Sequence, residues 1–567
     1  MTEAISVATA GLGRAGRTIT PARALWWLAL LTIVLGAVRI AATYPVFSAT
    51  FDEPAHIATG MQLLDRHEFT YEPLHPPLAR IAAALGPYLA GYHSQNGGDM
   101  WIEGRRMVYG RGGRPDADLL TLARVGILPF LVASLAMVWF WTARNFGQVE
   151  GALAVIVLGN LPVFLAHAGL ATTDVPFATT FAAAFFAFLF WFERPSLPRG
   201  LVLGTAVALA LCTKLSALLF LPASCGAVVA YGWLAEGRTW RLGHLIRSWH
   251  QGLAPLGAFL LTIWVVFGCQ SDPLYGIMSL AHGVGELAAF AGHGEPSYFL
   301  GAINTHGSWA FFPVLLLVKS PIPFLVAVAI GAAVLIRAYR RDWRRMAPLI
   351  GALAIVASVI PSTINIGLRH ILPVLPLLAI VAAAGLGRLL ATPWPPQRMA
   401  LAGLLLVWQV GEAAAAAPHY LAYFNQFALG QPQRIVVGSD LDWGQDVRRL
   451  LADLKRRQIP LVHLAVHTSA DLRKHDMPPF ETMYPGEPTT GWIAISEQIR
   501  AFYCAGYSWL DAHQPVARIG SSILLYNVPG PPAEAGVPDL LRKFSWNVPQ
   551  PCLPPSRSAS PARRHPT

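Results

Sequence analysis

The chain has 567 residues, of which 54% are hydrophobic and only 13% are charged, and its mean hydropathy is +0.46. Soluble domains carry about 25% charged residues, so this composition excludes an ordinary soluble protein and predicts a membrane protein. The net charge of +11 does not indicate nucleic-acid binding, because the basic residues cluster in short segments between apolar blocks. No nucleic-acid partner is expected.

The N-terminal residues 1–23 are rich in Ala, Gly and Arg and precede an apolar run from Ala24 to Tyr44. That run is longer than the core of a signal peptide and lacks a cleavage site, so we expect a retained first span after a cytoplasmic tail.

Eleven apolar blocks of roughly 15 to 28 residues predict transmembrane helices, because a hydrocarbon core of ~30 Å is crossed by about 20 helical residues. They lie near residues 24–44, 121–142, 149–167, 175–192, 200–213, 215–235, 252–269, 309–336, 347–361, 371–390 and 399–417. Residues 24–417 are therefore expected to form an all-α polytopic domain.

Three short connections, 193–200, 236–250 and 337–345, are strongly basic and fall on one side if the spans alternate. The excess of Lys and Arg in cytoplasmic loops assigns that side to the cytoplasm. The opposite side receives the loop 45–120, the turn 168–174, the junction at Lys214, the loop 270–308, the turn 362–370 and the tail.

The tail has ordinary polarity over residues 418–548. Residues 434–439 and 461–466 predict strands, and residues 446–457 predict an amphipathic helix. We therefore expect a small extracytoplasmic α/β domain, followed by a disordered segment at 549–567.

The five cysteines, Cys212, Cys225, Cys269, Cys504 and Cys552, have no metal-ligand or redox spacing. Cys504 and Cys552 could pair with each other if the tail is extracytoplasmic.

Acidic residues stand at the external ends of two apolar blocks. Asp52 and Glu53 follow the first block, and Asp174 begins another. Partial desolvation at a membrane surface makes a carboxylate more basic, so Asp52 could accept a proton from an attacking hydroxyl group. Asp52 and Asp174 could instead be helix N-caps, because Asp is favoured at that position.

Cations lie on the same side. Lys214 interrupts a long apolar stretch, Arg369 and His370 stand at the mouth of another block, and Lys319 lies within a block. Such cations suit a phosphate or pyrophosphate group, which leaves as an anion. Lys214 could instead extend toward the interface or pair with a carboxylate such as Asp174.

Four histidines complete the candidate substrate contacts: His56, His75, His293 and His306. His75 precedes two prolines, and Pro77 predicts the first turn of a helix lying along the interface; a surface histidine in a turn is the alternative. The spacing of His293 and His306 matches no standard metal site. We therefore expect no metal ligands and no organic cofactor, although a divalent cation stays compatible with the sequence.

Several of these motifs together resemble a known family. They are the AspGlu pair, HisProProLeu (75–78), ThrThrAspValPro (172–176), ThrLys (213–214) and GlyLeuArgHisIleLeuProValLeuPro (367–376). Over roughly residues 24–417 they are similar to GT-C glycosyltransferases of the protein O-mannosyltransferase and aminoarabinose transferase type.

The resemblance implies a GT-C fold of about eleven spans with external loop helices. It also implies transfer of a hexosyl or pentosyl group, with inversion, from a polyprenyl-phosphate carrier to a protein, lipid or glycan. By position in the family, Asp52 is implied as the catalytic base and Lys214 and Arg369 as contacts of the carrier phosphate. Glu53 and Asp174 are expected to orient the acceptor or to tune Asp52.

Two features depart from this resemblance, and two motifs in the tail refine it. Aminoarabinose transferases have LysProPro where this chain has His75-Pro76-Pro77, and no loop is long enough for the β-trefoil insertion of eukaryotic protein mannosyltransferases. TyrPheAsnGln (423–426) and SerAspLeuAspTrpGlyGlnAsp (439–446) resemble bacterial members of the group. They indicate a bacterial inner membrane, with the active site facing the periplasm.

The main alternative is a transporter or flippase of lipid-linked sugars. Transporters place charges near the midplane and often have repeated halves with broken helices, whereas here the charges collect at one mouth and no repeat is evident. An oligosaccharyltransferase is a second alternative, but the expected TrpTrpAspTyrGly motif is absent, and TrpTrp occurs only at 26–27.

Overall fold

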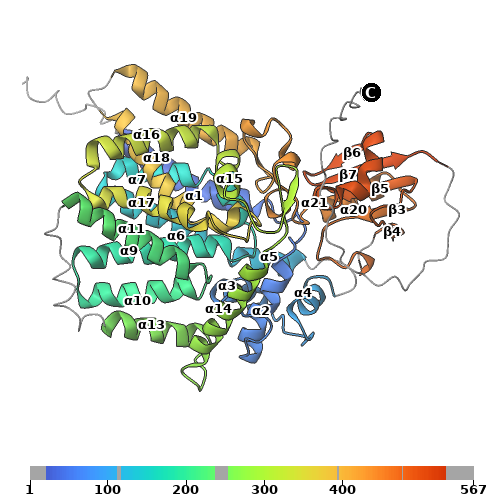
Figure 1. Cartoon of the computed structure of the whole chain (residues 1–567), viewed down its shortest axis with the longest axis horizontal. Coiled ribbons are helices and arrows are strands. Elements are labelled where there is room, and N and C mark those ends of the chain that lie inside the picture. Colours follow the sequence, from blue (N-terminus) through green and yellow to red (C-terminus); the bar gives the residue numbers. More distant parts are fainter. Residues whose placement is uncertain (1–20, 111–116, 237–252, 392–394, 475–476, 531–567) are drawn as a thin grey trace, which may run out of the picture.

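The computed structural model describes residues 21–110, 117–236, 253–391, 395–474 and 477–530. Long helices run side by side, and a small sheet domain lies at one end of this bundle (Figure 1). The predicted fold class, a helical membrane domain with a C-terminal α/β domain, is confirmed. The tail 549–567, residues 1–20 and nearly all of the basic stretch 236–250 lie outside the described residues.

Each of the eleven apolar blocks forms one helix or two consecutive helices. The bundle contains α1 (Pro21–Ala41), α5 (Ala117–Val125), α6 (Leu128–Asn145), α7 (Gln148–Leu158), α8 (Pro162–Ala168), α9 (Asp174–Glu193), α10 (Leu197–Leu211), α11 (Ala217–Glu236), α13 (Leu253–Val266), α15 (Phe311–Lys319), α16 (Ile322–Tyr339), α17 (Trp343–Val359), α18 (Val374–Leu390) and α19 (Pro396–Ala415). The block 149–167 bends by 70° between α7 and α8. Pro321 separates α15 from α16, because proline lacks the N–H that would continue the helix.

The chain is a multi-pass membrane protein. Within the described residues, five helical stretches are long and apolar enough to cross a membrane, or six if α7 and α8 form one span. Helices α10, α13 and α18 are apolar but shorter. The count of eleven spans therefore stays a prediction. Helix α18 is buried along most of its length, as expected of a helix that is apolar on all sides and packs at the centre.

The basic connections 193–200 and 337–345 meet at the end of the bundle far from the sheet domain (Figure 1). Glu193 joins them there, since it pairs with Arg344 at 3.2 Å and with Arg144 at 3.1 Å. The two positively charged connections therefore lie at one end, and the sheet domain at the other.

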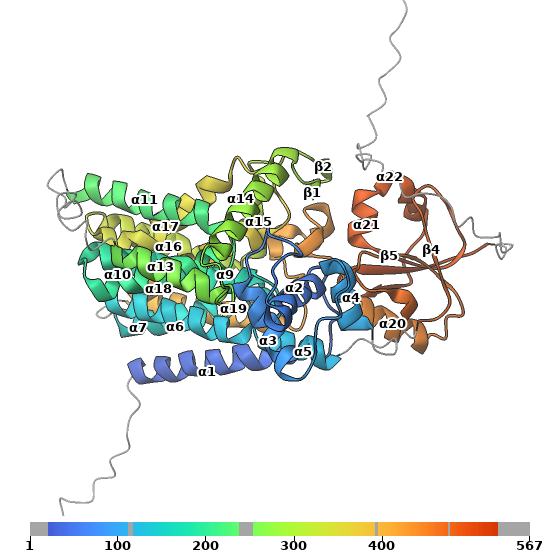
Figure 2. The same ribbon diagram turned by 90° about the horizontal axis from the view of Figure 1, so that it is seen from below.

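Four helices from the loops 45–120 and 270–308 lie between the bundle and the sheet domain (Figures 1 and 2). They are α2 (Glu53–Arg66), α3 (Leu78–Leu89), α4 (Met100–Tyr109) and α14 (Tyr275–His293). Helix α4 crosses the start of α2 at Gly104, where a Cβ atom would lie only 2.3 Å from the carbonyl oxygen of Pro54. This close approach requires glycine and fixes the N-terminal end of α2.

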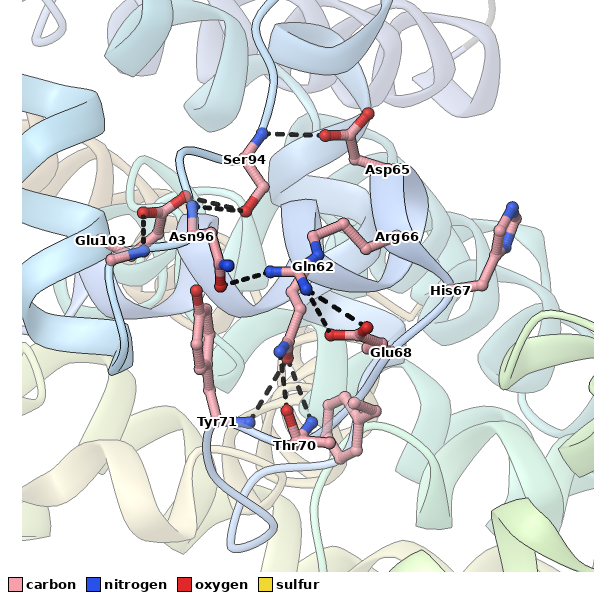
Figure 3. A network of polar contacts seen from close by, with 12 residues as sticks. Gln62, Asp65, Arg66, His67, Glu68, Thr70, Tyr71, Ser94, Asn96 and Glu103 are labelled. Atoms are coloured by element: carbon pink, nitrogen blue, oxygen red, sulfur yellow. Dashed lines mark hydrogen bonds and ion pairs between the residues drawn. The ribbon is translucent and has the colours of Figure 1, made fainter.

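Polar side chains hold the first external loop together (Figure 3). The side-chain oxygen of Gln62 accepts from the N–H groups of Thr70 and Tyr71 at 3.1 and 3.3 Å. The buried carboxylate of Glu103 accepts from the hydroxyl of Ser94 at 2.9 Å. The loop is thus a folded scaffold, although it lies outside the bundle.

The sheet domain has five strands in the order β4-β3-β5-β7-β6, with β3 parallel to β4 and β5 and the other pairs antiparallel. Its elements are α20 (Val447–Arg456), β3 (Val462–Ala465), β4 (Phe480–Thr482), β5 (Gly491–Ser496), α21 (Glu497–Phe502), α22 (Cys504–Tyr507), β6 (Ala517–Ile519) and β7 (Ile523–Val528). Helix α20 and strand β3 confirm the sequence prediction for these two segments.

The predicted strand at 434–439 is wrong. Val436 makes only an isolated bridge to Phe299, which lies in a hairpin of β1 (Ser297–Phe299) and β2 (Ala302–Asn304). Single 3-10 turns flank the segment at 432–434 and 438–440. These turns leave too little extended backbone for a strand.

Cys504 is disulfide-bonded, whereas Cys212, Cys225 and Cys269 are free. Cys552, its predicted partner, lies outside the described residues.

Candidate active site

Asp52 directly precedes α2, yet its side chain does not cap that helix. Its Oδ2 atom accepts a hydrogen bond from Nη1 of Arg369 at 2.8 Å. Arg369 lies in a single 3-10 turn, Leu368–Ile371, between α17 and α18. The side chain of Asp52 is therefore not a helix N-cap, the alternative role for this residue, and it pairs with Arg369 instead.

The backbone next to Asp52 is held by the tail. The N–H of Phe51 donates to the carbonyl of Trp443 at 2.9 Å, and the N–H of Ser48 donates to the carbonyl of Gln445 at 3.0 Å. Two short contacts thus tie the first external loop to residues 443–445, so the tail helps to place Asp52.

Glu53 is fully buried and does not line a described cavity. Its two carboxylate oxygens accept from Nε and Nη2 of Arg124, each at 2.8 Å, and Oε1 also accepts from the N–H of Ala171. Burial alone would raise the pKa of Glu53, but Arg124 holds that pKa below its ordinary value. Of the two roles expected for Glu53, this burial disfavours direct contact with the acceptor, whereas a role in tuning Asp52 stays a prediction.

Asp174 pairs with Lys214. The Nζ atom of Lys214 lies 2.9 Å from Oδ1 of Asp174, and their side chains are 8% and 1% exposed. Asp174 is the first residue of α9, and Lys214 lies in the break between α10 and α11. Of the alternatives for Lys214, pairing with this carboxylate is the one that the structure shows.

Arg369 connects the two acids. Its Nη1 atom lies 2.8 Å from Asp52 and 3.9 Å from Asp174, and its guanidinium group lies 4.2 Å from the ring centre of Trp443. Burial would lower the pKa of Arg369, but Asp52 and Asp174 raise it. Its Nε atom has no hydrogen-bond partner among the described residues. Four side chains thus form one continuous row of alternating charges: Asp52, Arg369, Asp174 and Lys214.

His56 and His75 lie beside each other, with ring centres 5.4 Å apart. Nε of Arg80 donates to Nδ1 of His56 at 3.3 Å, and Arg80 also pairs with Glu72. Burial, Arg80 and His75 hold the pKa of His56 well below its ordinary value, so His56 is neutral near pH 7. It can serve as a hydrogen-bonding group but not as a cation there.

His370 is electrostatically coupled to the row of charges. Burial, followed by Lys214 and Arg369, holds its pKa well below the ordinary value. His370 is therefore a neutral group beside two cations, and its role as a substrate contact stays a prediction.

A cavity of about 560 Å³ opens at Asp52 between the external loops and the sheet domain. This volume falls in the range of ~300–1,000 Å³ that is typical of small-molecule sites. It is lined by Phe51, Asp52, Glu295, Pro296, Ser297, Tyr298, Thr305, Asn365, Ile366, Arg369, Val436, Val437, Gly438, Ser439, Trp443, His467, Gln498, Phe502 and Tyr503. Burial lowers the pKa of His467 to about 4, so this wall residue is neutral.

A second, apolar cavity of about 520 Å³ lies among α9, α10, α11 and α13. Its lining is Ala184, Phe188, Leu203, Gly204, Val207, Leu211, Ala217, Leu218, Leu221, Pro222, Cys225, Pro255, Leu256 and Phe259. Leu211 and Ala217 flank the break that carries Lys214. An apolar chain in this cavity would therefore end near a cation.

Of the eight predicted substrate contacts, Arg369 alone lines either of these two cavities. His293 and His306 are exposed. Lys319 is fully buried and donates to the carbonyl oxygens of Leu421 and Asp440, each at 2.7 Å. Two of the three N–H bonds of its ammonium group are thus taken up by carbonyls of the tail, and the contact of Lys319 with a carrier phosphate stays a prediction. Within the described residues, no group of three or more His, Cys, Asp or Glu side chains is placed to hold a metal ion.

Several site residues were not predicted. Trp443 stacks on Arg369, Arg124 fixes Glu53, and Glu295 and His467 line the cavity. For Trp443 the signal is the tail motif 439–446, whose resemblance indicates a bacterial subgroup but not a place in the site.

Comparison with known proteins supports the resemblance seen in the sequence. Residues 122–265, about a quarter of the chain, match the family model described as dolichyl-phosphate-mannose-protein mannosyltransferase, which confirms the resemblance for this segment. No curated protein matches the chain.

Two of the solved structures that match the chain are distant from it in sequence. ArnT from Cupriavidus metallidurans bound to undecaprenyl phosphate is 15% identical, with 90% of this chain and all of that chain covered and a TM-score of 0.49. The archaeal oligosaccharyltransferase AglB from Archaeoglobus fulgidus, in complex with an inhibitory peptide and a dolichol-phosphate, is 14% identical. That comparison covers 69% of this chain and 56% of the other, with a TM-score of 0.41.

Proposed function

We propose that this protein is an inverting glycosyltransferase that moves a hexose or pentose from a polyprenyl-phosphate carrier to an acceptor hydroxyl group. The observation that carries the proposal is the row Asp52, Arg369, Asp174 and Lys214. It runs from a polar cavity at Asp52 to Lys214, beside an apolar cavity. The family match over residues 122–265 supports a lipid-phosphate sugar as donor.

The apolar cavity among α9, α10, α11 and α13 would hold part of the polyprenyl chain. The phosphate would lie near Lys214 and Arg369, where cations neutralise the charge of the leaving group. Both cations pair with carboxylates in this structure, so the phosphate would compete with Asp174 and Asp52 for them. The sugar would then extend into the polar cavity.

In the reaction, Asp52 takes the proton of the acceptor hydroxyl while the acceptor oxygen attacks the anomeric carbon. The bond between that carbon and the phosphate oxygen breaks, and its electron pair leaves with the carrier phosphate. Attack from the face opposite the leaving group inverts the anomeric configuration. Asp174 then acts on Lys214 and Arg369 rather than on the acceptor, because its side chain is buried between them.

We place this site on the periplasmic face of a bacterial inner membrane. The basic connections lie at the far end of the bundle, where the positive-inside rule assigns the cytoplasm. The disulfide-bonded Cys504 lies in the sheet domain, and such bonds persist in oxidising compartments. Both observations support an external cavity.

A flippase of lipid-linked sugars is the second candidate, because the same groups could bind and release a lipid phosphate. The position of the charges favours the enzyme: they lie beside a cavity that the sheet domain helps to enclose, whereas transporters place such groups near the midplane.

The two functions are separated by testing one preparation in two assays. Purified protein is given radiolabelled polyprenyl-phosphate mannose, glucose and aminoarabinose, and release of the label from lipid is measured. In parallel, the protein in vesicles is tested for movement of the same lipids between leaflets. Label release without movement supports the transferase, and movement without release supports the flippase.

A further inference from the structure

Glu295 lies in the wall of the polar cavity and is not used in the mechanism above. Its carboxylate makes no hydrogen bond or ion pair with any residue that the structure describes, and burial raises its pKa above the ordinary value. A partly buried carboxylate without a protein partner is costly, because its lost hydration is not replaced. A group in the cavity that donates hydrogen bonds would replace it.

The local fold holds Glu295 in this wall. Helix α14 ends at Gly294, whose φ of 71° is left-handed and where a Cβ atom would lie 2.2 Å from the carbonyl oxygen of Thr305. Only glycine fits this turn without strain. The N–H of Leu300 donates to the carbonyl of Ile435 at 2.9 Å, which anchors the following hairpin to the tail.

Aromatic side chains share the same cavity. The hairpin contributes Tyr298, and the sheet domain contributes Phe502 and Tyr503. Neutral hydrogen-bonding side chains line the same cavity, including Ser439 and Gln498. Aromatic faces pack against the apolar C–H faces of a sugar ring, while polar groups fix its hydroxyls.

The charge of the wall restricts the ligand further. Asp52 and Arg369 neutralise each other, so Glu295 leaves a negative charge among the described lining residues when it is ionised. Such a wall repels anionic acceptors. It attracts ligands that offer hydroxyl groups, and a carboxylate can accept from two neighbouring hydroxyls at once.

We propose that the acceptor is a neutral saccharide and that Glu295 binds its hydroxyl groups, an inference that rests on the transferase function proposed above. Glu295 determines acceptor specificity and takes no part in the proton transfer. The compact cavity, lined by separate segments of the loops and the tail, suits a saccharide better than an extended Ser- or Thr-containing peptide.

Direct binding tests this proposal without requiring turnover. The full-length protein in detergent is titrated with maltose, cellobiose and mannobiose, and with a neutral Ser/Thr heptapeptide, using calorimetry or ligand-observed NMR. At least one disaccharide should bind, and Glu295→Gln should weaken it about 10-fold or more, because hydrogen bonds to a charged group are among the stronger ones. Glu286→Gln, at an exposed position on α14, the helix that precedes Glu295, is the matched control and should bind as wild type does.

Binding of none of the disaccharides, binding of the peptide alone, or equal binding by wild type and Glu295→Gln would each overturn the proposal. Glu295→Asp is the second variant if Glu295→Gln fails to fold, and it should also weaken binding because the shorter side chain retracts the carboxylate.

Turnover provides a separate readout. Glu295→Gln should raise the KM for the saccharide acceptor and leave kcat and the KM for the lipid donor nearly unchanged, whereas a higher KM for the donor would contradict the assignment. The wild-type protein could release no sugar from any lipid donor and still bind a disaccharide that Glu295→Gln binds more weakly. That result would contradict the transferase function and support the saccharide site.

Discussion

Nη1 of Arg369 lies 2.8 Å from Oδ2 of Asp52, although 317 residues separate the two in the sequence. The same nitrogen lies 3.9 Å from Asp174, which is paired with Lys214. Arg369 therefore stands between the proposed base and the proposed phosphate site. On this account, a donor phosphate that attracts Arg369 also releases Asp52 to accept a proton, so the base becomes available when the donor is bound.

Arg369→Lys should reduce kcat for sugar transfer by about 10-fold or more. Lysine keeps the positive charge but lacks the planar guanidinium group that stacks on Trp443 while Nη1 contacts Asp52. Steady-state rates with a saturating lipid donor measure this effect. Arg337→Lys, at an exposed position, is the control, and equal rates for all three proteins would contradict the role of Arg369.

Lys214→Met should abolish binding of polyprenyl phosphate and also lower Tm, because it leaves Asp174 buried without its cation. Breaking a buried ion pair on one side costs about 3–5 kcal/mol. The double variant Lys214→Met with Asp174→Asn should recover most of the lost Tm but not the binding. Calorimetric titration with a short-chain polyprenyl phosphate measures binding, and recovered binding in the double variant would show that Lys214 does not contact the carrier.

Glu53→Gln should destabilise the protein, because Arg124 then remains buried without its carboxylate partner. We expect a clear fall in Tm, corresponding to about 3–5 kcal/mol. The KM for the acceptor should stay within about twofold in the folded fraction, because the carboxylate of Glu53 is buried against Arg124. An unchanged Tm together with a large rise in this KM would indicate instead that Glu53 orients the acceptor, one of the two roles expected from the sequence.

Asp442→Asn should raise Tm at pH 8 and change it little near pH 4.5. Burial raises the pKa of Asp442 from its ordinary value near 3.8 to about 7. The folded state therefore holds a proton that the unfolded state releases, so stability falls as pH rises from about 4 to 7. Above pH 7 the free energy of unfolding is lowered by at most ~4 kcal/mol, because each unit of pKa shift corresponds to about 1.36 kcal/mol. Asp118→Asn, at an exposed position, serves as the control. If Asp442→Asn raised Tm equally at pH 8 and pH 4.5, that result would contradict a buried charge at Asp442.

The sequence predicts much of this fold because apolar blocks are long and separated by clear polar breaks. All eleven blocks are helical, and α20 and β3 lie where the amphipathic and apolar patterns indicate. The strand at 434–439 fails because its apolar run, around Val436 and Val437, packs between 3-10 turns instead of pairing in a sheet. Local hydrophobicity does not show whether a partner strand is available.

Part of the site can also be predicted, in this case from the topology of the spans. Asp52, Asp174, Lys214 and Arg369 share one side of the membrane, so topology alone brings them near one another. Topology does not show which polar groups already have protein partners. Lys319 and Glu53 share that side but are occupied by tail carbonyl groups and by Arg124. The contributions of Trp443 and Glu295 depend on how the tail packs against the loops, and no local pattern in the sequence encodes that packing.

The most direct test of the central claim compares wild type with Asp52→Asn for transfer of radiolabelled sugar from polyprenyl phosphate to an acceptor. Asp52→Asn should lose at least about 100-fold in kcat, the contribution of a general base, while Tm and binding of polyprenyl phosphate are retained. Transfer by Asp52→Asn at the wild-type rate would contradict the assignment of Asp52 as the base.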